Sequence, residues 1–186
     1  MFKSPNEIPG MIEPIEQEML IELSETIKLD KNDQIIEFGS FFGRSTYCLA
    51  MGLKNNKTFL ASNKIIAFDS FMCRKNGSFY PHVINFAKLG KVENLIKHEN
   101  NDIDFEGIFK HFLNNEITSN LVIAEKVELK NTHPIENGNI ALMHIDSPKF
   151  YDELKHVFFR FFPKLKLGSI IVFQDYFYHW SATLIA

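Results

Sequence analysis

Residues 35–46 read IIEFGSFFGRST, and this stretch decides the fold. A short apolar run is closed by Gly39, and a helical pattern starts at Ser45, just after Gly43. Gly39 permits a tight turn without a Cβ clash, and Gly43 would let a ligand approach the backbone. Free N–H groups at the start of the helix would favour an anionic group such as a carboxylate. The stretch predicts a strand, a glycine loop and a helix that hold a small ligand; a plain strand-to-helix turn is the alternative.

The next apolar run, residues 63–71 (NKIIAFDSF), contains a carboxylate, Asp69, near its end. A carboxylate at the end of a second strand can accept both hydroxyls of a ribose. Asp69 lies farther from Gly39 than the roughly 20 residues typical of this arrangement, which residues 54–63 would explain as an extended connection. The spacing ExGxxxGxST also lacks the middle glycine that a pyrophosphate-binding loop needs. The pattern favours a nucleoside over a bare phosphate.

Strand-like and helix-like stretches alternate on both sides of this segment. We expect strands over residues 34–39, 63–71, 120–129, 139–146 and 169–176, and helices over residues 13–28, 45–53, 105–113 and 147–165. The last helix would start at Ser147 and Pro148, because serine can cap a helix and proline suits its first turn. Such alternation predicts an α/β fold with a parallel sheet and binding sites outside the carboxyl ends of the strands.

Acidic side chains lie at the ends of three of the expected strands. Asp69, Asp146 and Asp175 each follow an apolar run, and Glu37 lies two residues before Gly39. In a parallel sheet the carboxyl ends share one edge, so all four acids collect there. For any one of them a solvated acid or a helix cap is the alternative, but the set predicts a functional site at this edge.

The composition fits a single domain over residues 1–186, of which 45% are hydrophobic and 23% charged. We expect a helical lead over residues 1–33 and a variable substrate or lid region over residues 73–115, in which residues 73–101 form a loop with helical patches. A net charge of −3 gives no basic field for a polynucleotide, so we expect a small-molecule partner and no nucleic acid.

The amino-terminal residues and the two cysteines predict a cytoplasmic location with no membrane partner. Residues 1–20 carry acids and prolines where a signal peptide needs an apolar run. No apolar run reaches the roughly 18 residues of a membrane span. Cys48 and Cys73 lack metal-ligand spacing, so we interpret both as free thiols in a reducing compartment.

Four motifs in this order resemble those of class I S-adenosylmethionine-dependent methyltransferases, and within them the macrocin O-methyltransferase-like family, which acts on sugars of macrolides and other glycans. They are IIEFGSFFGRST, IIAFDSF, HIDSPKFYDE and PKLKLGSIIVFQDYFYHW, from Ile35 to Trp180. The resemblance implies a Rossmann-like doubly wound sheet of strand order 3-2-1-4-5. Because the sequence stops at Ala186, the usual strands 6 and 7 would be missing, either because the chain is naturally shortened or because it is a fragment. The exposed sheet edge would then favour a homodimer.

The resemblance also implies which residues bind the cofactor, S-adenosylmethionine. The implied positions are Glu37, Gly39, Ser40, Gly43, Ser45, Asp69, Ser70 and Asp146. Glu37, the two glycines and Ser45 would line the methionine end, and Asp69 would hold the ribose.

In the family members that use a divalent cation such as Mg²⁺, the resemblance implies that Asp146 and Asp175 hold it. Pro148 and Gln174 depart from the pattern, because metal-binding members commonly carry further acids there. Gln174 would then serve as a neutral oxygen ligand. A cation held this way could chelate two acceptor hydroxyls and lower the pKa of one. The alternative is that both acids only cap helices.

Lys149 stands three residues after Asp146, where family members often carry a histidine base and catechol O-methyltransferases carry a lysine. With Ser147 as N-cap, Lys149 would lie in the first helical turn, where the macrodipole should lower its pKa and help it act as a general base. Asp146 would position the acceptor oxygen. The alternative is that Lys149 is a surface lysine, and we expect His144 to be a satisfied structural histidine.

The favoured function is O-methylation of a hydroxyl on a sugar or other small polyhydroxylated or phenolic acceptor. The rival is a noncatalytic Rossmann-like nucleoside-binding protein derived from a methyltransferase, which the departures at Pro148 and Gln174 favour. A nicotinamide-dependent enzyme is disfavoured by the ExGxxxG loop.

Overall fold

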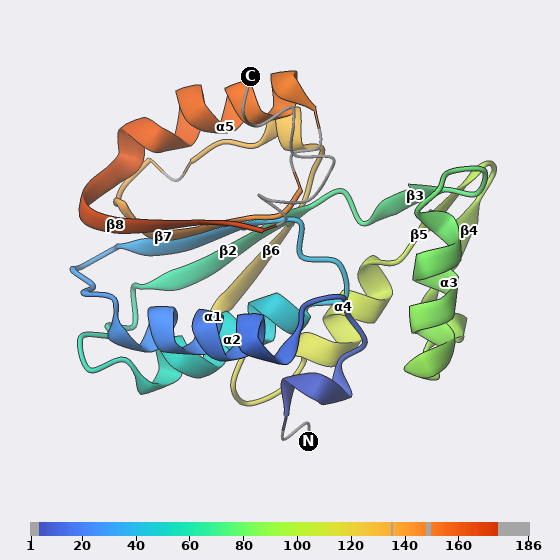
Figure 1. Cartoon of the computed structure of the whole chain (residues 1–186), viewed down its shortest axis with the longest axis horizontal. Helices are drawn as coiled ribbons and strands as arrows, with labels where there is room; N and C mark the ends of the chain where they lie inside the picture. Colours follow the sequence, from blue (N-terminus) through green and yellow to red (C-terminus); the bar gives the residue numbers. More distant parts are fainter. Residues whose placement is uncertain (1–3, 135, 148–149, 175–186) are drawn as a thin grey trace.

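The computed structural model describes residues 4–134, 136–147 and 150–174. Its centre is a five-stranded sheet in which all neighbouring strands are parallel (Figure 1). The strands are β1 (Gln34–Phe38), β2 (Lys64–Asp69), β6 (Val122–Lys126), β7 (Ile140–Ile145) and β8 (Leu165–Phe173). They lie in the order β6-β2-β1-β7-β8, which is 3-2-1-4-5 along the chain. The expected doubly wound α/β fold and its strand order are confirmed.

Helices cover both faces of this sheet. α1 (Pro14–Thr26), α2 (Arg44–Asn55) and α4 (Glu106–Leu113) lie on one face, and α5 (Tyr151–Phe161) lies on the other (Figure 1). Short 3-10 helices are η1 (Pro5–Glu7), η2 (Glu93–Leu95), η3 (Leu129–Asn131) and η4 (Phe162–Lys164). None of the helices in the described part of the chain is long and apolar enough to cross a membrane.

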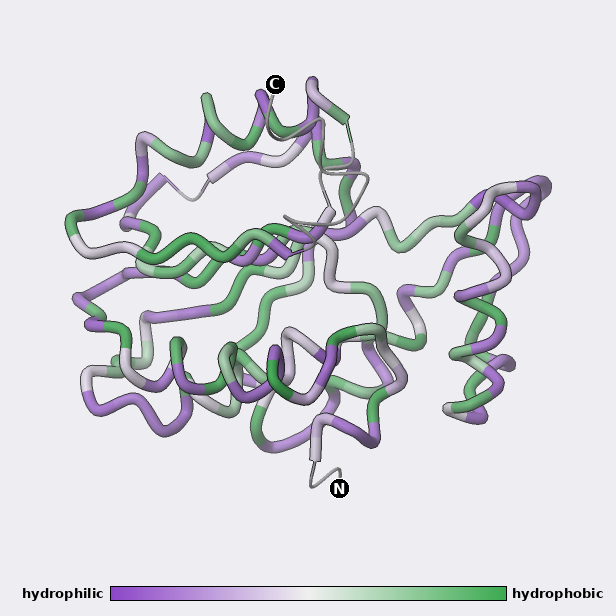
Figure 2. The backbone as a smooth tube through the Cα atoms, in the orientation of Figure 1, coloured by the Kyte–Doolittle hydropathy of each residue, from purple (hydrophilic) through white to green (hydrophobic). Residues whose placement is uncertain are grey.

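The core follows from the alternation of side chains along the buried strands. Successive residues of a strand point to opposite faces of the sheet. Ile35 therefore packs in the same cluster as Leu20 of α1 and Leu49 of α2, whereas Ile36 packs in the cluster that holds Val157 of α5. In Figure 2 the central strands are mostly in the colour of hydrophobic residues, as expected for strands that are buried between helices.

A smaller unit stands beside the carboxyl ends of β2 and β6 (Figure 1). It contains β3 (Met72–Arg74), α3 (Tyr80–Leu89), β4 (Lys97–Glu99) and β5 (Asp102–Asp104), and its three strands form an antiparallel sheet in the order β3-β5-β4. We call residues 72–104 the α3 module. The expectation of a loop with helical patches over residues 73–101 was wrong about the strands. Each strand has only three residues, too few to show a period in the sequence.

The start of α5 also differs from the expectation. The helix begins at Tyr151 with Phe150 as its N-cap, so Ser147 does not cap it. Ser147 is instead bound to the end of β1, because its backbone N–H donates to the carbonyl of Phe38 at 3.0 Å. The Phe150 N–H is satisfied by the Glu153 carboxylate at 3.3 Å.

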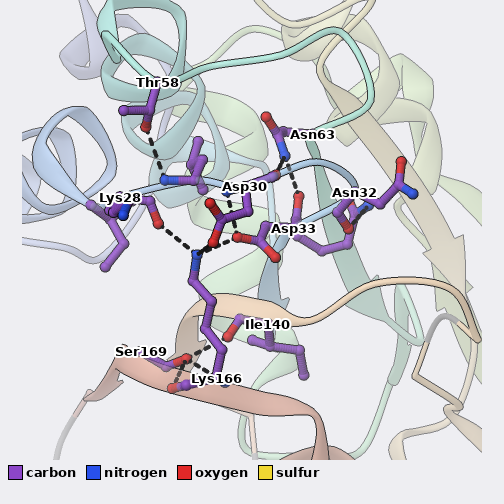
Figure 3. Close-up of polar contacts among 12 residues, drawn as sticks. Lys28, Asp30, Asn32, Asp33, Thr58, Asn63, Ile140, Lys166 and Ser169 are labelled. Carbon is purple, nitrogen blue, oxygen red and sulfur yellow. Dashed lines mark hydrogen bonds and ion pairs between the residues drawn. The ribbon is translucent and has the colours of Figure 1, made fainter.

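At the amino ends of the strands, a lysine of β8 and an asparagine before β2 both bind residues 28–33 (Figure 3). Lys166 Nζ donates to the Lys28 carbonyl at 2.9 Å, to Asp30 Oδ2 at 3.0 Å and to Asp33 Oδ2. Asn63 Nδ2 donates to the backbone carbonyls of Asp30 at 2.7 Å and Asp33 at 2.9 Å. Burial alone would lower the pKa of Lys166, but its bonds to the two aspartates outweigh that effect and raise it. We call these five residues the amino-edge cluster.

Candidate functional site

The strand register brings the sequence-predicted acids together at the carboxyl edge of the sheet. Phe38 lies opposite Phe68 on one side and Ile145 on the other, and Ile145 lies opposite Phe173. The residues that follow along this edge are therefore, in order, Lys126 at the end of β6, then Asp69, Gly39, Asp146 and Gln174. The expected gathering of Asp69 and Asp146 is confirmed, and Asp175 lies outside the described residues.

The two loop glycines are required by the backbone, but for different reasons. Gly39 has a φ of +90°, and a Cβ there would lie 2.8 Å from Ser147 Cβ and 2.9 Å from the Ser147 nitrogen. Gly43 has a φ of +95°, and a Cβ there would lie 3.0 Å from the Leu113 side chain. The space beside Gly43 is therefore filled by Leu113, whereas we expected a ligand to approach there. The positive φ at position 43 explains why a glycine is found there.

The amino end of α2 has the features of an anion site. Its N-cap is Gly43, so no side chain caps the helix, and its first turn contains no acid. The first N–H groups of a helix have no acceptor within it, and they carry the positive end of the helix dipole. Ser45 and Thr46 are buried here. The Ser40 hydroxyl in the preceding loop is also buried and has no hydrogen-bond partner among the described residues. A polar ligand would satisfy these groups.

Asp69 lies at the carboxyl edge and also binds the loop that follows β1. Its Oδ2 accepts the backbone N–H of Phe41 at 2.9 Å, and its Oδ1 accepts that of Phe71 at 2.7 Å. Burial raises the pKa of Asp69 to about 6, although these N–H groups and that of Ser40 oppose the shift. Each carboxylate oxygen can accept a further hydrogen bond. The geometry therefore fits a carboxylate that receives two ligand hydroxyls while it holds the loop in place.

A series of hydrogen-bonded side chains links α2, β1, β7 and the end of β8. Glu37 is fully buried; its Oε2 accepts the Thr46 hydroxyl, and its Oε1 lies 3.2 Å from His144 Nδ1. His144 Nε2 lies 3.0 Å from Gln174 Oε1. Burial alone would lower the pKa of His144, but the hydrogen bond and charge of Glu37 outweigh it, so the pKa is raised. His144 is thus a satisfied structural histidine, as expected. Glu37 thus joins α2 to β7 through Thr46 and His144, and its direct contact with a ligand stays a prediction.

The family of this chain is identified by a match to a protein-family model. A family model described as "Methyltransferase domain" matches residues 36–176, more than half of the chain. The chain belongs to this methyltransferase-domain family. No curated protein matches it at a significant level.

Solved structures share the fold of this methyltransferase domain. One is CalS11, a TDP-rhamnose 3'-O-methyltransferase of calicheamicin biosynthesis, at 22% identity and a TM-score of 0.55, over 92% of this chain and 66% of that one. The O-methyltransferase NovP matches at 15% identity and a TM-score of 0.66, over 95% of this chain and 72% of NovP. An S-adenosylmethionine-dependent O-methyltransferase from Thermotoga maritima matches at 13% identity and a TM-score of 0.53, over 94% of this chain and 49% of that one. The chain thus spans about half to two-thirds of the length of the first matched structures.

The described part of the methyltransferase domain does not fit a divalent cation. Gln174 was expected to offer a neutral oxygen, but its Oε1 lies 3.0 Å from His144 Nε2 and serves as the acceptor of that bond. Within residues 4–134, 136–147 and 150–174, no group of three His, Cys, Asp or Glu side chains is placed to hold a metal ion. Asp175, the other expected ligand, lies outside these ranges.

The remaining predicted site residues have mixed outcomes. Lys149 lies outside the described residues. α5 begins at Tyr151, so the expected helix start at Ser147, on which the lowered pKa of Lys149 was based, is wrong. Asp146 is half-buried, and its N–H donates to the Phe38 carbonyl at 3.0 Å. Ser70 is half-buried, and its hydroxyl accepts the N–H of Met72 at 3.3 Å.

Three residues around Asp69 were missed by the sequence analysis. Phe41 and Phe71 have left-handed backbones, with φ of 48° and 51°. Lys126, opposite Asp69 in the register, forms an ion pair with Asp104 at 2.8 Å. One signal could have found Phe71: in Asp69-Ser70-Phe71 an aspartate side chain bonds the backbone two residues on, as Asp does in Asx turns.

Proposed function

We propose that this methyltransferase domain binds S-adenosylmethionine along the carboxyl edge of its sheet. We further propose that it methylates a hydroxyl on a sugar or other small polyhydroxylated or phenolic acceptor, as a member of the macrocin O-methyltransferase-like family. The observation that carries the proposal is the pairing, in a chain of this family, of an uncapped helix amino end with a half-buried carboxylate on the neighbouring strand, Asp69.

The residues at this edge suit the two ends of the cofactor. The amino end of α2 suits the methionine carboxylate, because its free N–H groups and dipole favour an anion. Asp69 suits the ribose, because each of its oxygens retains acceptor capacity. The unpartnered Ser40 hydroxyl would gain a partner. We include Gly39, Gly43, Ser45, Ser70 and Asp146 in the proposed site.

When bound, S-adenosylmethionine supplies a methyl group on a positively charged sulfur. In our proposal the chain positions the acceptor and moves its proton. Asp146, beside Gly39 at the edge, orients the acceptor hydroxyl, and Lys149, in its neutral amine form, accepts the hydroxyl proton as the oxygen attacks. Correct orientation supplies much of the rate in such transfers. No step is assigned to a metal ion, because Gln174, one of the expected ligands, is bonded to His144.

A sugar acceptor is supported by the name of CalS11, which methylates TDP-rhamnose. The rival function, noncatalytic nucleoside binding, is favoured by one observation: Gln174, at a position where metal-binding members often have an acid, is bonded to buried His144. Either function requires the same nucleoside site.

Calorimetry and a transfer assay separate these functions. We expect saturable binding of S-adenosylhomocysteine and no binding of NAD. We then expect transfer of labelled methyl from S-adenosylmethionine to at least one member of a panel of TDP-sugars, free sugars and catechols. Binding without transfer to any acceptor would favour the rival, and absence of S-adenosylhomocysteine binding would overturn both.

A further inference from the structure

The two backbone bonds of Asp69 go to residues in an unusual conformation. Phe41 and Phe71 have φ of 48° and 51°, a left-handed region that large side chains rarely adopt. Each donates its N–H to one oxygen of Asp69, at 2.9 Å and 2.7 Å. One carboxylate therefore fixes two strained turns, one in the loop after β1 and the other after β2.

The rings of these two phenylalanines meet the same partner. Phe41 lies 5.7 Å from Phe105 between ring centroids, and Phe71 lies 6.0 Å from Phe105. Phe105 directly follows the α3 module and is the N-cap of α4. Its N–H also donates to the Phe71 carbonyl at 2.9 Å. The end of the α3 module is thus packed against both turns that Asp69 holds.

Phe41 also reaches the helix of the module. Its ring centroid lies 5.5 Å from that of Phe79, the N-cap of α3, and 5.8 Å from that of Phe86 within α3. On the far side of Asp69, Lys126 joins the main sheet to β5 through its 2.8 Å ion pair with Asp104. The module therefore contacts the main domain on both sides of Asp69, the carboxylate proposed to bind the ribose: through Phe41 on one side and through Lys126 on the other.

We propose that Phe41 and Phe71 are positioning residues that transmit the occupation of Asp69 by the cofactor to the α3 module, an inference that rests on the proposed function. Ribose hydroxyls that bind Asp69 fix the orientation of its carboxylate. This favours the geometry in which both N–H bonds are made and both rings are held against the module. A ligand shifts such an equilibrium only through interactions that differ between the two states; here the ribose hydroxyls bind Asp69 in the orientation that accepts both N–H groups. Cofactor binding thereby fixes the module, which flanks the edge where the acceptor must lie, before methyl transfer.

Amide hydrogen exchange of α3 with and without S-adenosylhomocysteine tests this. α3 contains none of the proposed cofactor ligands, so direct burial by the ligand does not account for protection there. We expect saturating S-adenosylhomocysteine to slow exchange in residues 80–89 by about tenfold, within the range of coupling between linked sites. In Phe41→Leu, which keeps the backbone N–H but loses the ring contacts, we expect less than about twofold slowing at ligand concentrations that saturate the variant. Phe41→Tyr should restore the wild-type response.

Matched variants keep the test decisive. Phe159→Leu, on the exposed face of α5 with 71% of its side chain accessible, should respond as the wild type does. If Phe41→Leu does not fold, the double variant Phe79→Leu, Phe86→Leu removes the two ring contacts between Phe41 and α3 from the module side. If the ligand binds and α3 exchange is unchanged, or if protection persists without the ring contacts, this inference is overturned and the proposed function stands. If the ligand does not bind the wild type, both are overturned.

Discussion

The amino and carboxyl ends of the parallel strands, which form the amino edge and the carboxyl edge, differ in how they accommodate charged side chains. At the amino edge, the ammonium of Lys166 is bonded to two aspartates, and the carboxylate of Asp33 is fully buried against it. At the carboxyl edge, burial of Asp69 raises its pKa to about 6, and its protein partners are backbone N–H groups rather than a cation. Each edge has one buried oxygen without a hydrogen-bond partner among the described residues, Asp33 Oδ1 at the amino edge and the Ser40 hydroxyl at the carboxyl edge. The difference is therefore one of charge: the amino edge pairs its acids with a cation, whereas Asp69 at the carboxyl edge is bonded to backbone N–H groups.

The largest effect should come from removing the cation of the amino edge. Lys166→Met leaves Asp33 buried without its charge partner, and breaking a buried pair in this way typically costs about 3 kcal/mol of unfolding free energy. Chemical denaturation measures the loss. Lys54→Met, at an exposed position of α2, is the control and should change stability by less than about 0.5 kcal/mol. Unchanged stability of Lys166→Met would contradict the claim that the amino-edge cluster stabilises the fold.

Removal of the acid at the carboxyl edge should affect binding more than folding. Asp69→Ala deletes the acceptor for two ribose hydroxyls, and we expect S-adenosylhomocysteine affinity to fall about 30-fold, or about 2 kcal/mol. Calorimetry measures this loss. Asp30→Ala, at the amino edge, should keep wild-type affinity. Equal affinities for both variants would mean that the ribose lies elsewhere.

The two edges should also differ in their response to pH. Asp69 is ionised above a pKa of about 6, so S-adenosylhomocysteine affinity should fall as the pH drops from 7 to 5, by about tenfold. Because this pKa is raised above the ordinary 3.8, Asp69 by itself contributes stability to the unliganded fold at low pH, and that contribution is lost as the pH rises through 6. The pKa of Asp30 is lowered by its bond to Lys166, so Asp30 should stay ionised over this range. Titrating calorimetry between pH 5 and 8 checks the binding, and a flat profile would contradict the role of Asp69.

The smallest expected effect is at Gln174. Gln174→Ala removes the acceptor for His144 Nε2 but leaves the pair with Glu37, so we expect a loss of about 1 kcal/mol in unfolding free energy and unchanged S-adenosylhomocysteine affinity. Thermal and chemical unfolding measure the first quantity, and calorimetry measures the second. A large loss of affinity with normal stability would instead place Gln174 in the ligand site.

The sequence predicted those features that depend on local patterns. Apolar runs followed by Asp69 and Asp146 were enough to place two strands and their shared edge. The α3 module was missed because its strands have three residues each and are held by packing around Phe105 rather than by a period. The amino-edge cluster was missed because Lys166 and Asp33 are 133 residues apart, and no local pattern joins them. The cap at Ser147 was wrong because a tertiary contact with β1 overrides the local preference of serine.

The pair of Glu37 and His144 has a consequence for how the chain assembles. The two residues lie directly opposite each other on β1 and β7, strands that are distant in the sequence. If β7 slipped by one residue, Met143 or Ile145 would face the buried carboxylate, and its charge would be left without compensation. A pairing shifted by one residue is therefore higher in free energy than the observed one. The contact between Glu37 and His144 thus favours a single register of β7 on β1.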